Sequence, residues 1–251
     1  MDAYLSSLKV ALKWERLLEQ VRTITERVGR RPEEITIVGV AKGQIIDKII
    51  EAISAGLRDI GENRVQEARM KKPIVEEGLN TLGIDPHKVR WHMVGRLQSN
   101  KIPYVVRLFD AVHSVEKADH AEKLSLMAGT LGKVIEVWME VNTSGETTKG
   151  GVPPEEALPL AERLMTLPHL KWKGLMTVGP LSDDPEKVRS AFRRLRVLKE
   201  KLEEQLALSQ PLGLSMGMSD DFPIAIEEGA TVIRIGTALF GPRSPQGHLN
   251  D

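Results

Sequence analysis

The sequence contains no cysteine, which excludes disulfide scaffolds, thiol catalysis, and zinc or iron–sulfur sites built on cysteine. It has no excess of charge of either sign, because 35 lysines and arginines balance 35 aspartates and glutamates. Overall charge therefore gives no support for attraction to nucleic acid or to an anionic membrane. No apolar stretch approaches the roughly 18 to 20 residues that span a bilayer. The N-terminus is amphipathic, carries acidic residues and is unlike a signal or transit peptide, so we expect a soluble cytoplasmic protein.

The two ends of the chain differ in character from the part between them. Residues 3–28 carry apolar side chains at a helical spacing, and Gly29 and Pro32 follow, so we predict an N-terminal helix within residues 1–30. Residues 242–251 have the proline, glycine and polar composition of a frayed terminus. No linker, internal repeat or low-complexity segment divides the sequence, so we expect residues 1–251 to form a single domain.

Between these ends, short apolar runs alternate with segments of helical periodicity. Strands are predicted near residues 35–42, 59–63, 90–95, 111–115, 134–142, 172–179, 212–217 and 232–236. The clearest helical patterns span residues 45–55, 154–166, 186–207 and 221–228. This alternation predicts βαβ units, and eight units in this length fit a closed (β/α)8 TIM barrel. An open doubly wound sheet is the alternative, but the Gly-x-Gly-x-x-Gly fingerprint that favours it is absent.

The first predicted strand ends in a lysine without an acidic neighbour, in the run ITIVGVAKGQ. Side chains alternate across a strand, so Lys42 shares a face with Val38 and Val40. The small residues Gly39 and Ala41 lie on the opposite face and leave room for a helix outside. Lys42 is therefore expected at the C-terminal mouth of the barrel, where barrel active sites lie. One interpretation is a lysine that extends its ammonium group to solvent; the other is a partly desolvated amine that forms a Schiff base with a carbonyl compound.

The segments after the seventh and eighth strands have features of a phosphate site. In barrels, the loops after these two strands commonly bind phosphate through backbone N–H groups. Ser219 and Thr237 offer hydroxyl donors, and Gly236 allows close approach of the backbone. Each feature alone usually serves only the fold, and it is their joint placement that favours a phosphate. Asp220 and Asp221 would repel a phosphate, so we assign them to capping of the following helix.

Arg234, in the eighth strand, shares a face with Val232 and Gly236 and is expected inside the barrel near its mouth. A buried arginine needs an acceptor for its N–H groups. A pyridine nitrogen is one candidate, and a structural carboxylate such as Asp59 or Glu140 is the alternative.

These residues lie within six successive segments: VGVAKGQ, DIGENRVQEA, RWHMVGRLQSNK, GLMTVGP, MGMSDDFPIAI and VIRIGTALFG. Their order, from about residue 30 to 241, resembles the pyridoxal phosphate homeostasis protein family, which is itself similar to the barrel domain of alanine racemase. The resemblance implies a protein that binds pyridoxal 5′-phosphate (PLP) as a Schiff base on Lys42. It also implies roles around the cofactor for Asn63 beside the ring, Met216 in the wall, Arg234 at the pyridine nitrogen, and Ser219, Gly236 and Thr237 at the phosphate.

Two positions depart from the family's pattern, and three other residues have open roles. Family members often have a serine before the lysine and a second lysine two residues after it, where this chain has Ala41 and Gln44. Lys149, in the segment SGETTKGG, is a candidate for a second PLP site, with a solvated loop lysine as the alternative. His92 and His113 either reach the mouth or lie in the core. No two histidines have zinc-ligand spacing, so no metal site is predicted.

The chemistry implied by the resemblance favours a carrier of PLP over an enzyme. An arginine at the pyridine nitrogen leaves that nitrogen unprotonated and the ring a weaker electron sink. In alanine racemase a catalytic tyrosine comes from a second domain, whereas this chain ends about 15 residues after its eighth strand. We therefore expect a protein that buffers, stores or delivers PLP. A narrow-scope PLP-dependent amino-acid racemase is the alternative from a different class, and a Schiff-base aldolase is a third possibility.

The expected partners follow from the same reasoning. Apo forms of PLP-dependent enzymes are the candidate acceptors of the cofactor. Nucleic acid is not expected, because the arginines of the segment 186–207 are interleaved with glutamates, which is typical of a solvated helix with i,i+4 ion pairs. An exposed barrel mouth without a covering domain is compatible with a monomer.

Overall fold

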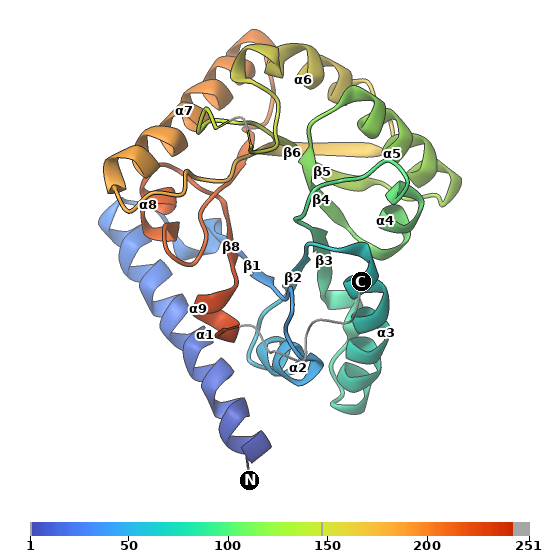
Figure 1. Ribbon diagram of the computed structural model, residues 1–251, viewed down its shortest axis with the longest axis vertical. Helices are drawn as coiled ribbons and strands as arrows, with labels where there is room; N and C mark the ends of the chain where they lie inside the picture. Colours follow the sequence, from blue (N-terminus) through green and yellow to red (C-terminus); the bar gives the residue numbers. More distant parts are fainter. Residues whose placement is uncertain (1, 147, 243–251) are drawn as a thin grey trace.

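Eight short strands pair in parallel and close into a barrel, with helices around its outer face (Figure 1). The computed structural model describes residues 2–146 and 148–242. The strands are β1 (Thr36–Val40), β2 (Asp59–Glu62), β3 (Arg90–Met93), β4 (Ala111–Val115), β5 (Ile135–Glu140), β6 (Leu170–Met176), β7 (Gly213–Ser215) and β8 (Val232–Ile235). Each strand pairs with its neighbour in sequence, and β8 pairs with β1 with Val38 opposite Arg234. The prediction of a (β/α)8 barrel is confirmed, and the open-sheet alternative is wrong.

Helices lie between successive strands, before β1 and after β8, and cover the barrel wall. They are α1 (Asp2–Arg27), α2 (Ile46–Ser54), α3 (Val65–Thr81), α4 (Ile102–Leu108), α5 (Ala118–Thr130), α6 (Ala157–Met165), α7 (Pro185–Gln205), α8 (Phe222–Glu227) and α9 (Thr237–Phe240). The start of α7 shows how the sequence sets a boundary: Asp184 accepts a hydrogen bond from the Glu186 N–H, and Pro185 occupies the first turn. The predicted N-terminal helix is α1, which packs against α2, α8 and α9. Residues 243–251 of the predicted frayed tail lie outside the described residues.

Apart from β4, which ends at Val115 as predicted, the strands end earlier than the apolar runs predicted. β1 ends at Val40, so Lys42 follows the strand instead of closing it, as the prediction of a strand over 35–42 had placed it. Gly43 has a φ of 66°, a backbone conformation that favours glycine, and turns the chain directly after the lysine. The mouth of the barrel is thus formed by turns that follow the strand ends.

The apolar core has two parts. The larger part lies between the strands and the helices, and the smaller lies inside the barrel around Val38, Trp138, Met176 and Val232. Gly39 shows how closely the outer layer packs, because a Cβ atom there would lie 2.6 Å from Leu57 Cδ2. The expectation that small residues of β1 face the outer packing layer is confirmed. Among the residues that the structure describes, no helix combines the length and apolar character needed to cross a bilayer.

Candidate functional site

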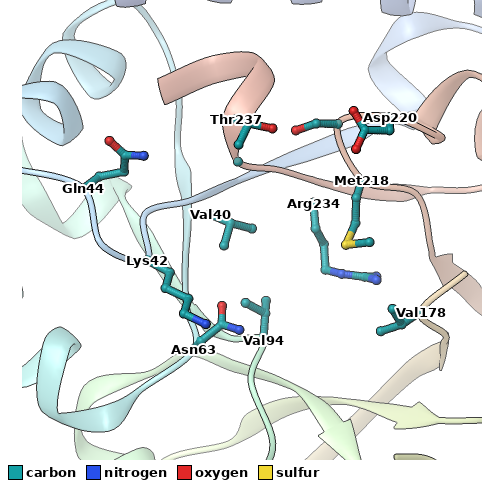
Figure 2. Close-up of a pocket in the computed structure, with 12 residues that line it drawn as sticks. Val40, Lys42, Gln44, Asn63, Val94, Val178, Met218, Asp220, Arg234 and Thr237 are labelled. Atoms are coloured by element: carbon teal, nitrogen blue, oxygen red, sulfur yellow. The ribbon is translucent and has the colours of Figure 1, made fainter. Parts of the chain in front are cut away.

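A cavity of about 370 Å³ opens at the C-terminal mouth of the barrel (Figure 2). Its lining comes from β1 and β8 and from the segments that follow β1, β2, β3, β6, β7 and β8: Val40, Lys42, Gln44, Asn63, Val94, Val178, Met218, Ser219, Asp220, Arg234, Gly236 and Thr237. The size is typical of a small-molecule site. Val94 and Val178 lie at its base, packed on the small apolar cluster inside the barrel. Six of the seven residues predicted for a site therefore share one cavity, and their roles toward a ligand stay predictions.

The turn that carries Lys42 is held from both sides by buried charges of the next βα unit. Lys71, on α3, donates a hydrogen bond of 2.8 Å to the carbonyl oxygen of Ala41. Glu67, one turn earlier on the same helix, accepts a hydrogen bond of 2.9 Å from the N–H of Gly43. The two peptide groups that flank Lys42 are thus fixed, whereas the half-buried side chain of Lys42 extends into the cavity (Figure 2). The clamp gives a structural role to two residues of α3, Glu67 in the segment VQEA and Lys71.

The clamp contains a third charge. Lys71 Nζ lies 2.8 Å from Glu62 Oε1 and 3.0 Å from Glu67 Oε2, so one ammonium group serves two carboxylates. Burial raises the pKa of Glu62 to about 7, although Lys71 opposes the shift. The second carboxyl oxygen of Glu62 is buried without a hydrogen-bond partner among the described residues, which fits a carboxyl that is readily protonated.

Arg234 also lines the cavity and is almost fully buried. Its guanidinium group donates three hydrogen bonds, to the carbonyl oxygen and the hydroxyl of Ser215 and to the carbonyl oxygen of Thr177. All three acceptors are neutral, so neither Asp59 nor Glu140 is its direct partner. Burial lowers the pKa of Arg234 to about 10, and the group stays cationic at neutral pH. A guanidinium has five N–H donors, so two are left over from these bonds to serve a ligand in the cavity.

The two loops predicted to hold a phosphate meet at the other edge of the cavity. Ser219, after β7, accepts a hydrogen bond of 3.1 Å from the N–H of Ala238 in α9, and its own hydroxyl hydrogen stays available. At Gly236 a Cβ atom would meet no atom closer than 3.7 Å, so packing within the protein does not require glycine there. The absent side chain instead leaves the cavity open to a ligand. Thr237 begins α9 and places its hydroxyl on the same rim (Figure 2).

The two aspartates of the β7–α8 loop differ in position. Asp221 precedes α8 and accepts a hydrogen bond from the Met218 N–H, within the loop. Asp221 takes the N-cap position of α8, but its side chain makes no hydrogen bond to the helix, and Asp220 is exposed and lines the cavity. The assignment of both aspartates to helix capping is therefore wrong. The loop turns before α8 begins at Phe222, and this leaves Asp220 on the rim.

Met216 is the one predicted site residue that the structure places elsewhere. It is fully buried in the outer core, between the barrel and the helices. Ser215 points inward to Arg234 and His113, so strand alternation turns its neighbour Met216 outward. Met218, two residues later and past Gly217, lies in the cavity instead. Strand alternation alone would put Met218 on the same face as Met216, and it lies in the cavity because β7 ends at Ser215 and Gly217, with a φ of 95°, turns the chain.

Lys149 and Gln44, the two positions where a second lysine was considered, are both engaged with the protein. Lys149 Nζ donates to Glu146 Oε1 at 2.9 Å and to the Gly179 carbonyl oxygen at 2.6 Å, which ties together the loops after β5 and β6. The alternative of a solvated loop lysine is wrong, because the side chain is mostly buried. Gln44 lines the cavity and donates to the Gly241 carbonyl oxygen. The second PLP site stays a hypothesis.

His92 and His113 do not reach the mouth. Both are buried inside the barrel, where His92 Nδ1 lies 2.9 Å from His113 Nε2. The core interpretation of these histidines therefore holds. Within residues 2–146 and 148–242 no group of three or more histidine, aspartate or glutamate side chains is arranged to hold a metal ion.

The side chains around the cavity fit one kind of ligand. The Lys42 amine suits a carbonyl group, a cationic arginine suits a ring nitrogen or another neutral acceptor, and the hydroxyls and glycine of the two loops suit a phosphate. Three complementary groups at separate edges of one cavity favour a small phosphorylated aldehyde with an acceptor in its ring.

Comparison with known proteins shows that the chain is similar to one family over most of its length. Residues 13–244 match the family described as alanine racemase, N-terminal domain. The pyridoxal phosphate homeostasis protein of Aquifex aeolicus (strain VF5) is 42% identical over 228 residues, which cover 91% of this chain and 96% of that protein. The protein of the same name from Vibrio alginolyticus is 38% identical over 229 residues, with coverage of 91% and 95%.

Solved structures show the same likeness. An unknown protein from Bifidobacterium adolescentis superposes with a TM-score of 0.85 at 33% identity, covering 94% of this chain and 96% of that one. PipY of Synechococcus elongatus PCC7942, solved with PLP bound, has a TM-score of 0.75 at 35% identity and coverage of 87% and 100%. An alanine racemase of Clostridium difficile, 17% identical with a TM-score of 0.70, shares the fold over 57% of its own length.

Proposed function

The chain belongs to the pyridoxal phosphate homeostasis protein family, and from this premise we propose that it binds PLP as a Schiff base on Lys42 and buffers, stores or delivers it, without strong catalytic turnover. The observation that carries the proposal is the joint presence of Lys42, Arg234 and the rim hydroxyls in one cavity. Relatives named for PLP homeostasis, and the PLP-bound structure of PipY, support it.

Each part of the cavity has a role in holding the cofactor under this proposal. Lys42 would attach covalently to the aldehyde, and Asn63 would lie beside the ring. Arg234 would donate to the pyridine nitrogen through one of its remaining N–H groups. A second set of residues would bind the phosphate: Ser219, Gly236 and Thr237. When bound, PLP supplies an electrophilic aldehyde and a ring that withdraws electrons.

The composition of the cavity favours a carrier over an enzyme. A racemase needs an acid or base on both faces of the substrate α-carbon. Among the described residues that line the cavity, Lys42 and Asp220 are the only ones besides Arg234 that carry a titratable group. Tyr104 is on the outer helix α4 and is exposed, so it does not supply the tyrosine that a racemase would use. An arginine donor at the ring nitrogen also weakens the electron sink that carbanion chemistry requires.

The experiment that tests this proposal offers the PLP-loaded protein to an apo-aminotransferase. Reactivation of the apo-enzyme is expected, and PLP-treated Lys42→Ala, freed of unbound cofactor, should reactivate it far less. In parallel, deuterium incorporation into alanine and serine in heavy water should stay close to that of free PLP. Exchange at about 1 per second or faster would contradict the carrier and favour the racemase. Failure of the loaded protein to reactivate any acceptor would refute delivery.

A further inference from the structure

The interior of the barrel contains a continuous column of hydrogen bonds that the proposed cofactor chemistry does not use directly. Arg234 Nη1 lies 2.8 Å from Ser215 Oγ, which lies 2.8 Å from His113 Nδ1. His113 Nε2 lies 2.9 Å from His92 Nδ1, and His92 Nε2 lies 2.8 Å from Asp59 Oδ1. Five side chains from five different strands are thus joined across the barrel, from the edge of the cavity to the start of β2.

The column has a single consistent direction when both imidazoles are neutral. A carboxylate only accepts, so His92 Nε2 carries the hydrogen that is donated to Asp59. His92 Nδ1 is then an acceptor, and His113 must donate to it from Nε2. His113 Nδ1 in turn accepts the hydroxyl hydrogen of Ser215. The Ser215 oxygen is therefore oriented to accept from Arg234, as the 2.8 Å contact shows.

The alternative charge state does not satisfy the same groups. If His92 were cationic, both of its nitrogens would donate, and His113 would have to reverse and donate from Nδ1 to Ser215. The Ser215 oxygen would then accept from both His113 and Arg234, and its own hydrogen would have no acceptor among the described residues. An unsatisfied buried hydroxyl is costly, so the neutral arrangement is favoured.

The surroundings of His113 also hold it neutral. It is fully buried and stacks on Trp138, with ring centroids 5.3 Å apart. Burial lowers the pKa of His113 well below its ordinary value, and the positive charges of Arg234 and Arg90 add to the effect. Asp59, at the far end of the column, lies near Arg90 beside a second cavity of about 520 Å³ at the opposite end of the barrel.

We propose that Ser215, His113 and His92 are positioning residues for Arg234, and that their column, anchored on Asp59, holds the guanidinium group in the orientation that meets the cofactor ring. This deepens the proposed function and rests on it. Among the described residues, the other hydrogen-bond acceptors of Arg234 are two backbone carbonyl oxygens, and these do not orient the Ser215 hydroxyl. The histidines act through Ser215 and do not themselves line the cofactor cavity.

The first test needs no cofactor. The chain has six histidines, so nitrogen-15 spectra of their side chains are simple enough to assign with single substitutions. In the protein without PLP near neutral pH, both His92 and His113 should be neutral and protonated at Nε2. A His113 ring protonated at Nδ1, or a cationic His92, would overturn the column even if PLP binds as proposed.

The second test asks whether the column reaches the cofactor. Ser215→Ala removes the link between His113 and Arg234, and Ser114→Ala is the matched control, because Ser114 is an equally buried β4 hydroxyl that bonds to the Gly95 carbonyl oxygen outside the column. Ser215→Ala should release PLP at least about tenfold faster than Ser114→Ala, since the orientation of a charged donor is lost. In the Ser215→Ala variant, His113 should also no longer be held as a single tautomer protonated at Nε2.

The outcomes separate this inference from the function it rests on. Equal release of PLP by the two variants would refute the positioning role while leaving PLP binding intact. Absence of PLP binding in the wild-type protein would refute the proposed function, and the nitrogen-15 spectra would still decide on the column. If Ser215→Ala does not fold, His113→Phe takes its place, with Trp138→Phe as the control that disturbs the stacked pair but keeps every bond of the column.

Discussion

At the scale of single residues, the position of Lys42 is determined by groups that contact its neighbours in the chain. Lys71 and Glu67 bind the peptide groups on either side of it, and its own amine is left to the cavity. Such an arrangement fixes the base of a flexible side chain without neutralising its reactive end. It follows that substitutions in α3, away from the cavity, should alter the affinity for PLP.

Glu67→Ala should weaken PLP binding by about tenfold, because the N–H of Gly43 loses a charged acceptor and the Lys42 turn is released. Glu67→Gln is the matched control, since its amide oxygen can still accept from Gly43 and should keep most of the affinity. Absorbance titration of each variant with PLP measures the effect. Unchanged affinity in Glu67→Ala, with the fold intact, would contradict a positioning role for the clamp.

Glu62 gives the clamp a pH dependence that can be predicted in sign. Its pKa is raised from 4.5 to about 7, so the folded state binds the proton more tightly than the unfolded state. The resulting stability is fully present below pH 4.5 and is lost as the pH rises through about 7. Between these values the free energy of unfolding should fall with pH more steeply in the wild-type protein than in Glu62→Gln, by at most about 1.4 kcal/mol per pH unit.

Urea unfolding of the two proteins at pH values across this window is the measurement. The difference between their slopes isolates Glu62 from the other titrating groups. Parallel curves would show that Glu62 is ionised in the folded protein throughout, held by Lys71.

At the scale of structural elements, the loops after β7 and β8 form one rim, joined by the hydrogen bond between Ala238 and Ser219. Gly236→Ala tests whether this rim serves a ligand. The added methyl group would meet only ordinary contacts within the protein, the nearest at 3.7 Å, so stability should change little. It would project toward the cavity and weaken PLP binding, whereas pyridoxal without its phosphate should be affected much less.

The matched comparison is between PLP and pyridoxal on the wild-type protein. Several hydrogen bonds to a charged phosphate make a difference of at least about tenfold in affinity. Equal affinity for the two aldehydes would refute the phosphate rim, and so would a Gly236→Ala variant that binds both as the wild-type protein does.

The elements themselves were largely predictable, because alternating apolar runs and helical periods are local signals. Strand ends were not, since the turn at Gly43 depends on contacts with α3 that lie 24 residues away in sequence. The same limit explains the wrong prediction for Met216, because the face to which its side chain points depends on where β7 begins and ends. It also explains the arginines of α7, which pair with α8 and not mainly along their own helix as predicted.

The candidate site was predictable where strand alternation and motif order act together, as for Lys42 and Arg234. The polar column behind Arg234 was not, because it joins β2, β3, β4, β7 and β8, and no local pattern reveals which inward residues meet across a barrel. Asp59 was considered as a direct partner of Arg234, and it reaches the arginine only through three intervening side chains.

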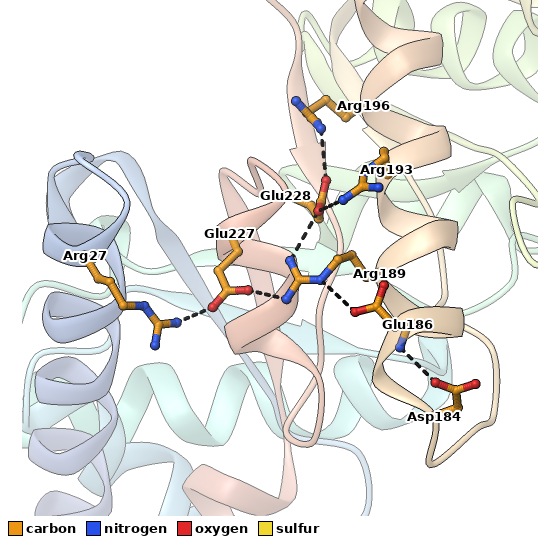
Figure 3. Close-up of polar contacts among 8 residues, drawn as sticks. All are labelled: Arg27, Asp184, Glu186, Arg189, Arg193, Arg196, Glu227 and Glu228. Carbon is orange, nitrogen blue, oxygen red and sulfur yellow. Dashed lines mark hydrogen bonds and ion pairs between the residues drawn. The ribbon is translucent and has the colours of Figure 1, made fainter.

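At the scale of the whole molecule, a network of ion pairs joins the first helix of the chain to the last part of the barrel (Figure 3). Glu227 of α8 pairs with Arg27 of α1 and with Arg189 of α7. Glu228, which is nearly buried, accepts from Arg189 at 3.2 Å and from two further arginines of α7, Arg193 and Arg196. Two adjacent glutamates thus tie three helices together on the outside of the barrel.

Glu228→Gln should lower the free energy of unfolding by about 2 kcal/mol, because three arginines lose the charge they share. Burial alone would raise the pKa of Glu228, but Arg193 and Arg189 outweigh it and the pKa is lowered, so the stabilisation is lost as the pH falls through that lowered value. Glu186→Gln is the control, since that exposed pair with Arg189 should contribute almost nothing. Urea unfolding measures both, and an equal effect of the two substitutions would contradict the role given to Glu228.

The residues of the ion-pair network are separate from the residues proposed to bind PLP. The ion pairs lie outside the barrel, whereas the residues assigned to PLP line the cavity at its mouth. Glu228→Gln should therefore leave the affinity for PLP unchanged at temperatures where the variant is folded.

The measurement that tests the central claim most directly is reduction of the PLP-treated protein with borohydride, followed by mass mapping of the labelled peptide. The Schiff base proposed at the cavity predicts a single reduced adduct on Lys42, and its loss in Lys42→Ala. Lys48 is a suitable control site, because it lies on the adjacent α2 and its amine is bound to Gln44 and to the Phe240 carbonyl oxygen. An adduct that persists undiminished in Lys42→Ala, mapped to Lys149 or to any other lysine, would contradict the account.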